Sequence, residues 1–301
     1  MTGPVVLIAN PAAGRGRSMH LAEQAANALQ AQGVPAIVQA PQDVPAAQSC
    51  ARQAMDDGAR AVVACGGDGT MSTVLQAVAG SPTPFAILPC GTGNDNAQEL
   101  GMPRRVDRWT QAVASALAAG RVRPIDLGRA ATAHSERWFM GVLSTGFDSS
   151  VNERANRMAW PPGQAKYLVG TLAELGSFSP IAYRVMIDEV EHSDHGMLVC
   201  VGNGARYGGG MRVCPQAQVD DGELDLTWLA QVPKATFLRV FPTVFRGTHV
   251  RHPAVRTMRG RRIQIDAPGQ VAYADGERIG ALPVRIEVAP AALGVLDLRP
   301  A

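Results

Sequence analysis

The sequence predicts a mixed α/β protein of two parts, an amino-terminal three-layer α/β domain and a carboxyl-terminal β-sandwich. Three observations lead to this prediction. Short apolar runs alternate with helical stretches over residues 1–126, and strand-like runs then follow one another with few helices up to residue 290. The chain also has 301 residues, which exceeds the usual size of a single core, so two domains are expected.

The first part has the pattern of a parallel sheet covered by helices on both faces. Short runs rich in Val and Ile, separated by helices, are typical of such sheets. The expected strands are Val5–Ala9, Ala36–Ala40, Ala61–Cys65 and Phe85–Pro89, and the expected helices are Ser18–Gln30, Val44–Asp57, Met71–Ala79 and Val106–Ala119. The pattern ends near Arg123 and Pro124, so we place the end of this domain at residue 126.

The second part, residues 127–290, has the pattern of a mostly antiparallel structure. The expected strands are Trp138–Leu143, Ala182–Ile187, Met197–Gly202, Leu224–Leu229, Arg262–Ile265, Gln270–Ala274 and Val284–Val288. Helical insertions are expected over Gln164–Leu175 and Pro233–Phe245. The apolar tail, residues 291–301, could return to the first domain.

Composition narrows the function classes. The net charge of +2 argues against a protein that coats nucleic acid. Five cysteines are an odd number without a C-x-x-C pair, which favours reduced thiols and a cytoplasmic location. The chain enters an apolar strand without a basic leader, and no run approaches 18 apolar residues, so we expect a soluble or at most peripheral protein.

The strongest functional signal is the run Cys65-Gly66-Gly67-Asp68-Gly69-Thr70, which lies between an expected strand and an expected helix. The carboxyl ends of parallel strands are where α/β proteins bind ligands. Glycine lets backbone amides approach phosphates, and an acid among them is understandable if Mg²⁺ stands between the Asp68 carboxylate and the phosphates. Asp68 as a plain helix N-cap is the alternative, but it leaves the glycines unexplained.

Two more loops are expected at the same edge of the sheet. The run Asn10-Pro11-Ala12-Ala13-Gly14-Arg15-Gly16-Arg17-Ser18 could hold an anion at a helix N-terminus, although it matches neither the P-loop nor the dinucleotide fingerprint and could be only a tight connection. The run Gly91-Thr92-Gly93-Asn94-Asp95 follows the next strand, where Asn94 and Asp95 could instead cap a helix. Three such loops together favour phosphate binding.

These motifs together resemble the catalytic domain of the diacylglycerol kinase and sphingosine kinase family, in particular its bacterial diacylglycerol kinase and lipid kinase members. The resemblance begins with Asn-Pro-x-x-Gly at Asn10, Gly-Gly-Asp-Gly-Thr at Gly66 and Gly-Thr-x-Asn-Asp at Gly91. It continues through Val201-Gly202-Asn203, Gly208-Gly209-Gly210-Met211, Pro215, Asp221-Gly222-x-Leu224-Asp225 and Asp275-Gly276-Glu277. It therefore covers nearly the whole chain.

The resemblance implies a nucleotide-binding domain like that of NAD kinases and phosphofructokinases, a β-sandwich, and an active site in the cleft between them. It implies ATP with Mg²⁺ as the phosphoryl donor and a lipid hydroxyl as the acceptor. Together with the loop analysis it gives an expected ATP site of Asn10, Pro11, Ala12, Ala13, Gly14, Arg15, Gly66, Gly67, Asp68, Gly69, Thr70, Thr92, Asn94 and Asp95.

Two acidic motifs of the second part take their expected roles from the resemblance. The acids of the family's Asp-Gly-Glu are linked with taking the proton of the acceptor hydroxyl, so Asp275 is our first choice of base and Glu277 the alternative, beside Asp68 as the third catalytic carboxylate. Asp-Gly is also a strong hairpin signal, and both roles can hold at once.

A second metal loop is also implied, with a structural Mg²⁺ held by the Asp221 side chain and the carbonyls of Gln218 and Glu223. A plain turn is the alternative for this loop.

A long basic segment is the last notable feature. From Leu226 to Ile265 there is no Asp or Glu, whereas Lys234, Arg239, Arg246, Arg251, Arg256, Arg259, Arg261 and Arg262 are positively charged. Apolar residues recur at near-helical spacing over 237–245, so residues 234–262 could rest on the anionic headgroups of the inner membrane surface. Alternatively, the apolar residues pack on the sandwich and the arginines are solvated. Nucleic acid is not expected as a partner, and the oligomeric state stays open.

We therefore expect an ATP-dependent lipid kinase, a phosphotransferase with an alcohol acceptor. The nearest alternative is a kinase of a soluble acceptor such as NAD or a sugar phosphate. A catalytically silent lipid- or nucleotide-binding regulator is a further alternative, which the presence of Asp68, Asp275 and Glu277 disfavours.

Overall fold

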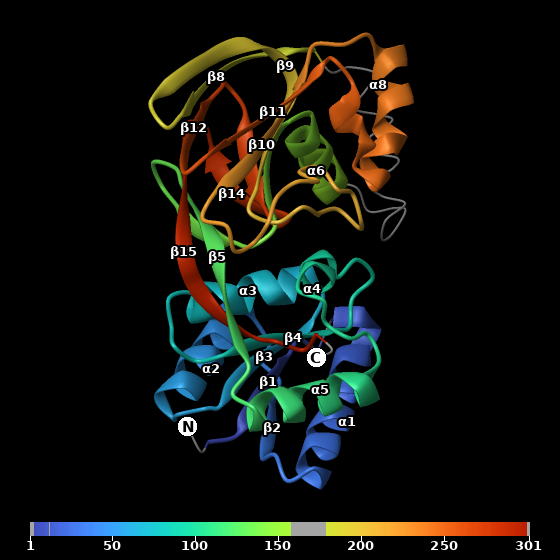
Figure 1. The fold of residues 1–301 in the computed structure, drawn as a ribbon, viewed down its shortest axis with the longest axis vertical. Coiled ribbons are helices and arrows are strands. Elements are labelled where there is room, and N and C mark those ends of the chain that lie inside the picture. The colour runs from blue at the N-terminus through green and yellow to red at the C-terminus, as the bar shows by residue number, and fades with distance from the viewer. Residues whose placement is uncertain (1–2, 12, 158–178, 300–301) are drawn as a thin grey trace. The chain divides into compact units, whose positions relative to one another are not determined.

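The computed structural model describes residues 3–11, 13–157 and 179–299, and the chain divides into two compact units (Figure 1). Unit 1 comprises Met1–Leu127 and Pro290–Ala301, and unit 2 comprises Gly128–Ala289. The last residues of the chain thus belong with the amino-terminal unit. In the described part of the chain, no helix is both long and apolar enough to cross a membrane.

Unit 1 is built on a parallel sheet. The strand β1 (Val5–Ala9) lies between β2 (Ala36–Gln39) and β3 (Ala61–Gly66), β3 pairs with β4 (Phe85–Pro89), and the end of β15 (Val284–Leu296) pairs with β4. Every residue of β1, β3 and β4 is buried, as expected for strands that are covered on both faces. The four strands predicted for this part are confirmed.

Helices cover both faces of this sheet (Figure 1). They are α1 (Arg17–Ala31), α2 (Val44–Asp56), α3 (Asp68–Val78), α4 (Asp95–Glu99) and α5 (Val106–Ala118), with the 3₁₀ turn η1 (Ala13–Gly16) before α1. The helix α1 packs against α5, and α2 packs against α3. The start of α2 shows why the chain turns helical there, because the Asp43 side chain accepts a hydrogen bond from the N–H of Ala46 at 2.8 Å as an N-cap.

Unit 2 is mostly antiparallel. Its main sheet has the order β14-β13-β7-β9-β8-β12-β15, β10 pairs with β9 and β11, and β5 pairs with β6 and β15. The strands are β5 (Val122–Ala131), β6 (Glu136–Phe139), β7 (Val142–Gly146), β8 (Ile181–Ile187), β9 (Val190–Gly202), β10 (Leu224–Ala230), β11 (Val255–Gly260), β12 (Arg262–Asp266), β13 (Val271–Ala274) and β14 (Glu277–Ala281).

The strands of unit 2 pack around a buried apolar core. Alternate residues of β8 point inward, so Tyr183 and Val185 reach a core that also holds Phe139, Trp228 and Ile265. Such alternation is typical of a sheet with one buried and one exposed face. The β-sandwich class predicted for the second part is confirmed.

The helices of unit 2 differ from the prediction. The expected helix Pro233–Phe245 is confirmed only as far as α8 (Lys234–Val240), and the chain continues as the 3₁₀ turns η2 (Phe241–Arg246) and η3 (Thr248–Arg251). Pro242 accounts for the change, because proline has no N–H to donate within an α-helix. The helix α6 (Phe147–Arg157) was not predicted. The expected helix Gln164–Leu175 lies outside the described residues.

The bounds of one predicted strand were also wrong. The expected strand Trp138–Leu143 is two strands, β6 and β7, separated by Met140 and Gly141. The first pattern was expected to end near Arg123 and Pro124, and both residues lie within β5, which was not among the expected strands. The strands β11 and β14 were missed.

Candidate active site

Two glycine loops of unit 1 touch each other at the carboxyl ends of β3 and β4. The N–H of Cys90 donates to the carbonyl of Gly66 at 2.8 Å, and Gly67 and Gly91 come so close that a Cβ on Gly91 would lie 2.7 Å from the Cα of Gly67. A side chain at position 91 would therefore force the two loops apart. The second and third predicted loops thus form one continuous backbone surface.

The first glycine loop adjoins the second one. The N–H of Asn10 donates to the carbonyl of Cys65 at 3.4 Å, and the buried Ser18 hydroxyl donates to the carbonyl of Asn10. These bonds fix the turn between β1 and η1. Ala12 lies outside the described residues, and of the remaining predicted residues here, Asn10 is exposed while Pro11 and Ala13 are partly buried.

Asp68 stands at the start of α3 with its side chain partly buried. One carboxylate oxygen, Oδ1, accepts a hydrogen bond from the N–H of Asn96 at 3.2 Å, which ties the second loop to α4. Among the described residues the second oxygen has no hydrogen-bond partner. A carboxylate oxygen left in this way beside glycine amides fits a hard cation such as Mg²⁺.

The remaining predicted residues of the third loop have different surroundings. The Asn94 side chain accepts the N–H of Gly91 at 2.9 Å and donates to its carbonyl at 2.7 Å, so it holds the loop in shape, and the left-handed backbone of Asn94 (φ 57°) completes the turn. Asp95 is buried, whereas Thr92 is exposed at the loop surface. Thr70 packs beneath Gly66. Within this set, Thr92 is the side chain best placed to meet a ligand.

Two cysteines lie beside these loops but cannot serve as nucleophiles. Burial raises the pKa of Cys65 well above its ordinary value and that of Cys90 to about 11. Both thiols are therefore protonated near neutral pH. All five cysteines are free thiols, as predicted.

In unit 2, Asp275 occupies the turn of the hairpin formed by β13 and β14. Asp275 (φ 48°) and Gly276 (φ 82°) both have left-handed backbones, as a two-residue hairpin of this kind requires. The carboxylate of Asp275 accepts three backbone hydrogen bonds, from Met140 at 2.9 Å, from Gly141 at 3.0 Å and from Val142 at 3.3 Å. The side chain is thus engaged in holding the break between β6 and β7.

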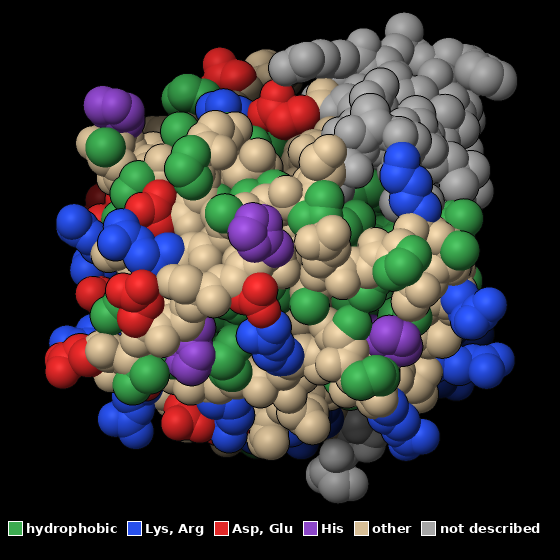
Figure 2. Space-filling view, turned by 90° about the horizontal axis from the view of Figure 1, so that it is seen from above, with side chains coloured by type: hydrophobic (Ala, Val, Ile, Leu, Met, Phe, Trp, Pro, Cys, Tyr) green, Lys and Arg blue, Asp and Glu red, His purple; other side chains and the backbone are tan. Residues whose placement is uncertain are grey.

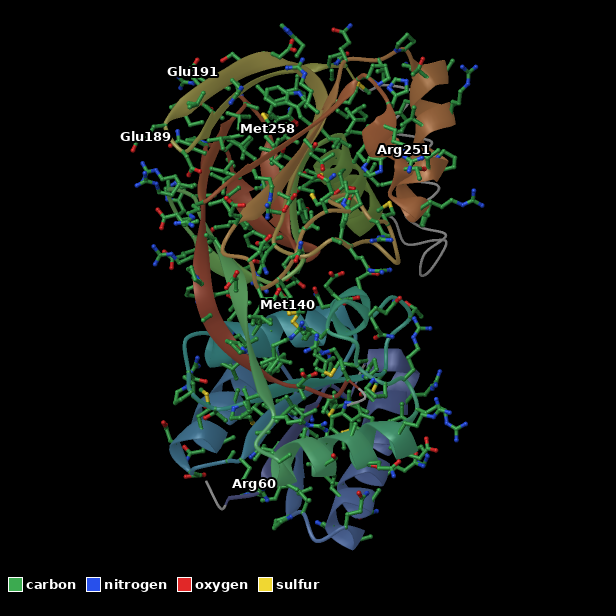
Figure 3. All side chains as sticks on the ribbon, in the orientation of Figure 1. Arg60, Met140, Glu189, Glu191, Arg251 and Met258 are labelled. Carbon is green, nitrogen blue, oxygen red and sulfur yellow. The ribbon has the colours of Figure 1, made fainter. Side chains whose placement is uncertain are left out.

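Asn203 holds the same break from the other side. Its side-chain amide donates to the carbonyl of Met140 at 3.0 Å, and its backbone N–H donates to the carbonyl of Gly141 at 2.9 Å. Both Asn203 and Met140 are fully buried, and Figure 3 labels Met140. Sequence reasoning quoted Asn203 as part of a motif but gave it no role, since its partner is distant in the sequence.

Glu277 directly follows the turn and is only partly buried. The neighbouring cross-strand pair, Tyr273 and Arg278, converges on one oxygen of Glu153 in α6, with distances of 2.9 Å from the Tyr273 hydroxyl and 2.8 Å from Nε of Arg278. Glu153 therefore ties α6 to both arms of the hairpin that carries Glu277. Sequence reasoning missed this contact, because α6 itself was not predicted.

The predicted second metal loop contains a guanidinium in this structure. Arg259 of β11 forms ion pairs with Asp221, with Glu223 at 2.9 Å and with Asp225 at 3.4 Å. Burial raises the pKa of Asp225, and the positive charge of Arg259 opposes that shift. No group of three or more metal-binding side chains is found among the described residues. The role of Gln218, Asp221 and Glu223 as metal ligands stays a prediction.

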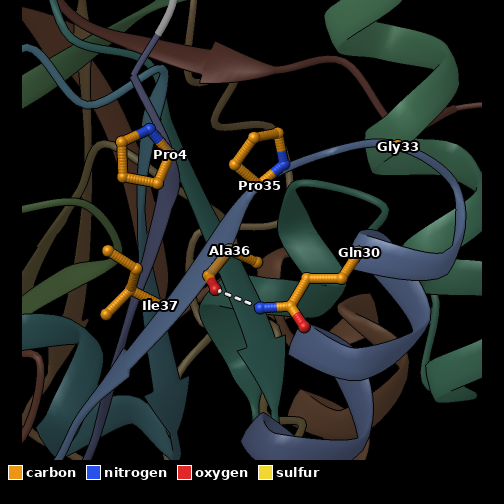
Figure 4. Close-up of a pocket in the computed structure, with 6 residues that line it drawn as sticks. All are labelled: Pro4, Gln30, Gly33, Pro35, Ala36 and Ile37. Carbon is orange, nitrogen blue, oxygen red and sulfur yellow. Dashed lines mark hydrogen bonds between the residues drawn. The ribbon is translucent and has the colours of Figure 1, made fainter.

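A shallow hollow elsewhere in unit 1 is not part of this site. It is lined by Pro4, Gln30, Gly33, Pro35, Ala36 and Ile37 (Figure 4). These residues lie at the amino ends of β1 and β2, opposite to the strand ends that carry the glycine loops. The Gln30 side chain donates to the carbonyl of Ala36 at 2.8 Å and so caps one group of the edge strand β2.

Comparisons with known proteins agree with these features. The family model described as "Diacylglycerol kinase catalytic domain" matches residues 4–130, and the one described as "YegS C-terminal NAD kinase beta sandwich-like domain" matches residues 141–297. A Mycobacterium tuberculosis protein named "Diacylglycerol kinase" is 39% identical over 299 residues, which cover 99% of this chain and 96% of that protein. A Xanthomonas oryzae pv. oryzae protein named "Probable lipid kinase YegS-like" is 36% identical over 183 residues, or 58% of each chain.

Solved structures share the fold. A diacylglycerol kinase from Bacillus anthracis matches with a TM-score of 0.73 at 19% identity, covering 97% of this chain and 96% of its own. An NAD kinase from Archaeoglobus fulgidus in complex with ATP matches with a TM-score of 0.53 at 12% identity, covering 97% and 92%. The family models, the full-length sequence match and the glycine loops lead to one conclusion: the chain belongs to the diacylglycerol kinase family.

Proposed function

We propose that this protein transfers the γ-phosphoryl group of ATP to the hydroxyl of a lipid related to diacylglycerol. The observation that carries the proposal is the continuous backbone surface of the loops at Gly66–Thr70 and Gly91–Asp95, with Asp68 beside it. Glycine amides at the carboxyl edge of a parallel sheet are suited to phosphates. The full-length relative named diacylglycerol kinase supports a lipid as the acceptor.

Asp68 is the proposed holder of Mg²⁺. When bound, the ion would neutralise charge that develops on the phosphates during transfer. Asn10, the Gly66–Gly69 backbone and Thr92 are proposed to hold the nucleotide around it. The interdomain cleft implied by the resemblance stays a prediction, as does the second metal loop.

Glu277 is a better candidate than Asp275 for the base. Phosphoryl transfer forms a bond between the acceptor oxygen and the γ-phosphorus and breaks the bond from the γ-phosphorus to the bridging oxygen of ADP, and the acceptor proton must go to a base. A base needs a free lone pair at its oxygen. The Asp275 carboxylate already accepts three backbone hydrogen bonds, whereas Glu277, two residues further along the chain, is partly exposed.

The decisive experiment is a transfer assay with radiolabelled ATP. The acceptors are diacylglycerol, other hydroxylated lipids, NAD and sugar phosphates, each with Mg²⁺ and with excess chelator. We expect label in a lipid fraction only, and only with Mg²⁺. Label confined to NAD or sugars would replace the lipid acceptor by a soluble one, and no label with any acceptor would favour a silent regulator.

The base is tested by Glu277→Gln. We expect kcat to fall about 10²- to 10⁴-fold, the usual contribution of a positioned base, while ATP binding is unchanged. The matched control is Glu23→Gln, which changes an exposed glutamate of α1. Full turnover in Glu277→Gln would remove Glu277 from this role.

A peripheral contact with the cytoplasmic face of a membrane is also proposed, through residues 234–262, because a lipid acceptor resides in a bilayer. The five free thiols are consistent with that compartment.

A further inference from the structure

The basic segment at residues 234–262 divides into two halves with different charge environments. In the second half, the β11 and β12 side chains are paired: Arg256 with Asp194, Arg259 with the acids of the 221–225 loop, and Arg262 with Glu189 at 3.0 Å. Their charge is therefore largely neutralised within unit 2. Of the four arginines in this half, only Arg261 has no ion pair among the described residues, so this half has less unpaired charge to offer to a partner than the first half has.

The first half, over α8, η2 and η3, remains cationic. Arg239, Arg246 and Arg251 are exposed, and none of them has an ion pair within the described part of the chain. Figure 3 places Arg251 near α8, on the opposite side of unit 2 from Glu189 and Glu191. Figure 2 agrees, because Lys and Arg side chains on the α8 side are not accompanied by the coloured Asp and Glu side chains that are seen on the other side.

Large apolar side chains are exposed in the same half. Leu238 is 49% exposed and Phe245 is 50% exposed, and few other large apolar residues of the described chain are as accessible. Leu238 directly precedes Arg239, and Phe245 directly precedes Arg246. Apolar side chains next to unpaired cations are the combination that binds the interface of an anionic bilayer.

The exposed side chains stand on a well-packed base. Phe237 and Val244 are buried, and a chain of ring contacts runs from Phe147 to Phe237 at 4.8 Å, from Phe237 to Phe241 at 5.7 Å and from Phe241 to Phe245 at 6.5 Å between centroids. The apolar residues of this segment thus pack partly on the sandwich, which is one of the two alternatives that the sequence left open. Phe245 ends the chain of rings at the surface.

A further arginine adjoins this face. The N–H of Arg212 donates to the carbonyl of Val244 at 3.0 Å, so its backbone lies beside η2. Arg212 lies outside the basic segment defined from the sequence, its Nε is buried, and we do not count it among the exposed cations of this face.

We propose that Leu238 and Phe245, flanked by Arg239, Arg246 and Arg251, form a docking surface for an anionic lipid bilayer. Leu238 and Phe245 enter the interface while the guanidinium groups meet lipid phosphates. The proposal deepens the proposed function, since it names the surface by which a lipid kinase reaches its substrate. An acidic macromolecule such as RNA is less suited, because it offers no apolar medium for Leu238.

The test is co-sedimentation of the full chain with vesicles, without ATP. Vesicles of phosphatidylcholine alone are compared with vesicles of phosphatidylcholine mixed with phosphatidylglycerol. We expect binding to the anionic vesicles only. Arg246→Ala should weaken it about fivefold, since each Arg near an anionic surface contributes about 1 kcal/mol. The double variant Leu238→Asp with Phe245→Asp should weaken it more than about tenfold, because it removes apolar burial and adds repulsion.

Matched controls come from the other side of unit 2. Val190→Asp changes an apolar residue that is 58% exposed, and Arg184→Ala removes an exposed arginine that is paired with Asp266. Both should leave vesicle binding within twofold of the unchanged protein. Circular dichroism of each variant checks that the fold is retained.

Several outcomes would overturn the docking surface. These are equal binding to neutral vesicles, equal loss in the Val190→Asp control, unchanged binding in the double variant, or displacement from vesicles by RNA with tighter binding to RNA. Phosphorylation of a short-chain diacylglycerol, dispersed as a monomer, separates this proposal from the proposed function. A double variant that keeps this activity but loses vesicle binding supports docking, whereas vesicle binding without any lipid phosphorylation refutes only the proposed function.

Discussion

Asp68 in unit 1 and Asp275 in unit 2 look alike in the sequence, yet their surroundings differ. Each follows a strand and stands beside a glycine. The Asp68 carboxylate accepts one backbone hydrogen bond, from Asn96, and begins a helix. The Asp275 carboxylate accepts three from Met140, Gly141 and Val142, and it occupies a hairpin turn.

The difference shows that the number of backbone hydrogen bonds a carboxylate accepts indicates whether it can still bind a ligand or mainly holds the backbone. A carboxylate offers about four lone-pair positions, and each position that accepts an N–H can no longer bind a metal ion or a proton. By this measure Asp68 retains capacity for a cation, whereas Asp275 mainly fixes the backbone that presents Glu277. The predictions below test this division.

The largest expected effect is that of Asp68→Asn on turnover. The amide keeps the size of the side chain and its bond from Asn96, but it removes the negative charge proposed to hold Mg²⁺. We expect kcat to fall at least about 10²-fold with an unchanged melting temperature. Asp56→Asn, at the exposed end of α2, is the control. An Asp68→Asn enzyme with normal magnesium dependence would contradict the assignment.

Asp275→Asn should act on stability as well as on turnover. An amide oxygen can accept some of the three N–H groups, but its NH₂ must face another donor, and a buried unsatisfied donor costs about 1–3 kcal/mol. Chemical denaturation measures the free energy of unfolding. Asp266→Asn, which breaks a surface ion pair with Arg184, should cost much less. Lost activity with no lost stability would instead favour Asp275 as the base.

Gly91→Ala should separate the two loops that surround Asp68. Its Cβ would lie 2.7 Å from the Cα of Gly67, so the backbone must move, and we expect ATP affinity to fall roughly tenfold or more. Gly294→Ala in β15 is the control, because its Cβ would meet the side chain of Val122 at 3.0 Å, near the amino end of β4 and away from the glycine loops. Calorimetric titration with ATP and Mg²⁺ measures both. Equal affinities in the two variants would mean that loop contact does not matter.

Glu153→Gln should loosen the hairpin that Asp275 turns. The neutral amide weakens the bonds from Tyr273 and Arg278, and a charge-assisted bond is roughly twice as strong as a neutral one. We expect kcat to fall several-fold with KM for ATP unchanged, since Glu153 acts by positioning. Glu287→Gln, which affects the surface pair with Arg129, is the control. A changed KM with an unchanged kcat would contradict a positioning role.

The smallest expected effect concerns pH. Burial lowers the pKa of His249, whose Nε2 lies 3.1 Å from the carbonyl of Val213. As the pH falls, His249 therefore takes up a proton in the unfolded chain, near a pKa of about 6.5, before it does so in the folded protein. The free energy of unfolding thus decreases as the pH drops below about 6.5. Thermal unfolding over this range should show a smaller loss in His249→Gln. An identical pH dependence of the melting temperature in the variant would show that His249 does not cause the loss of stability.

Much of unit 1 was predictable because its signals are local. Buried parallel strands are continuous apolar runs, and the loops after β3 and β4 show their glycines directly. Unit 2 was less predictable. Met140 and Gly141 look like the middle of a strand, and the break there depends on bonds to Asp275 and Asn203, which are distant in the sequence.

The basic segment shows the same limit. In the sequence its arginines are equivalent, because the acids that neutralise them, such as Asp194 and Glu189, lie on other strands. The exposure of its apolar side chains cannot be predicted from the sequence either. Phe237 and Phe245 belong to the same apolar pattern, yet Phe237 is buried and Phe245 is half-exposed.

The sequence alone thus determined the α/β class, the β-sandwich and the resemblance to lipid kinases, since strand periodicity and glycine motifs are properties of short stretches of chain. Tertiary structure decided which carboxylate keeps free oxygens and which arginines keep free charge. These depend on contacts between distant residues, because a hydrogen bond or an ion pair has effect only where folding brings its two partners within about 3 Å.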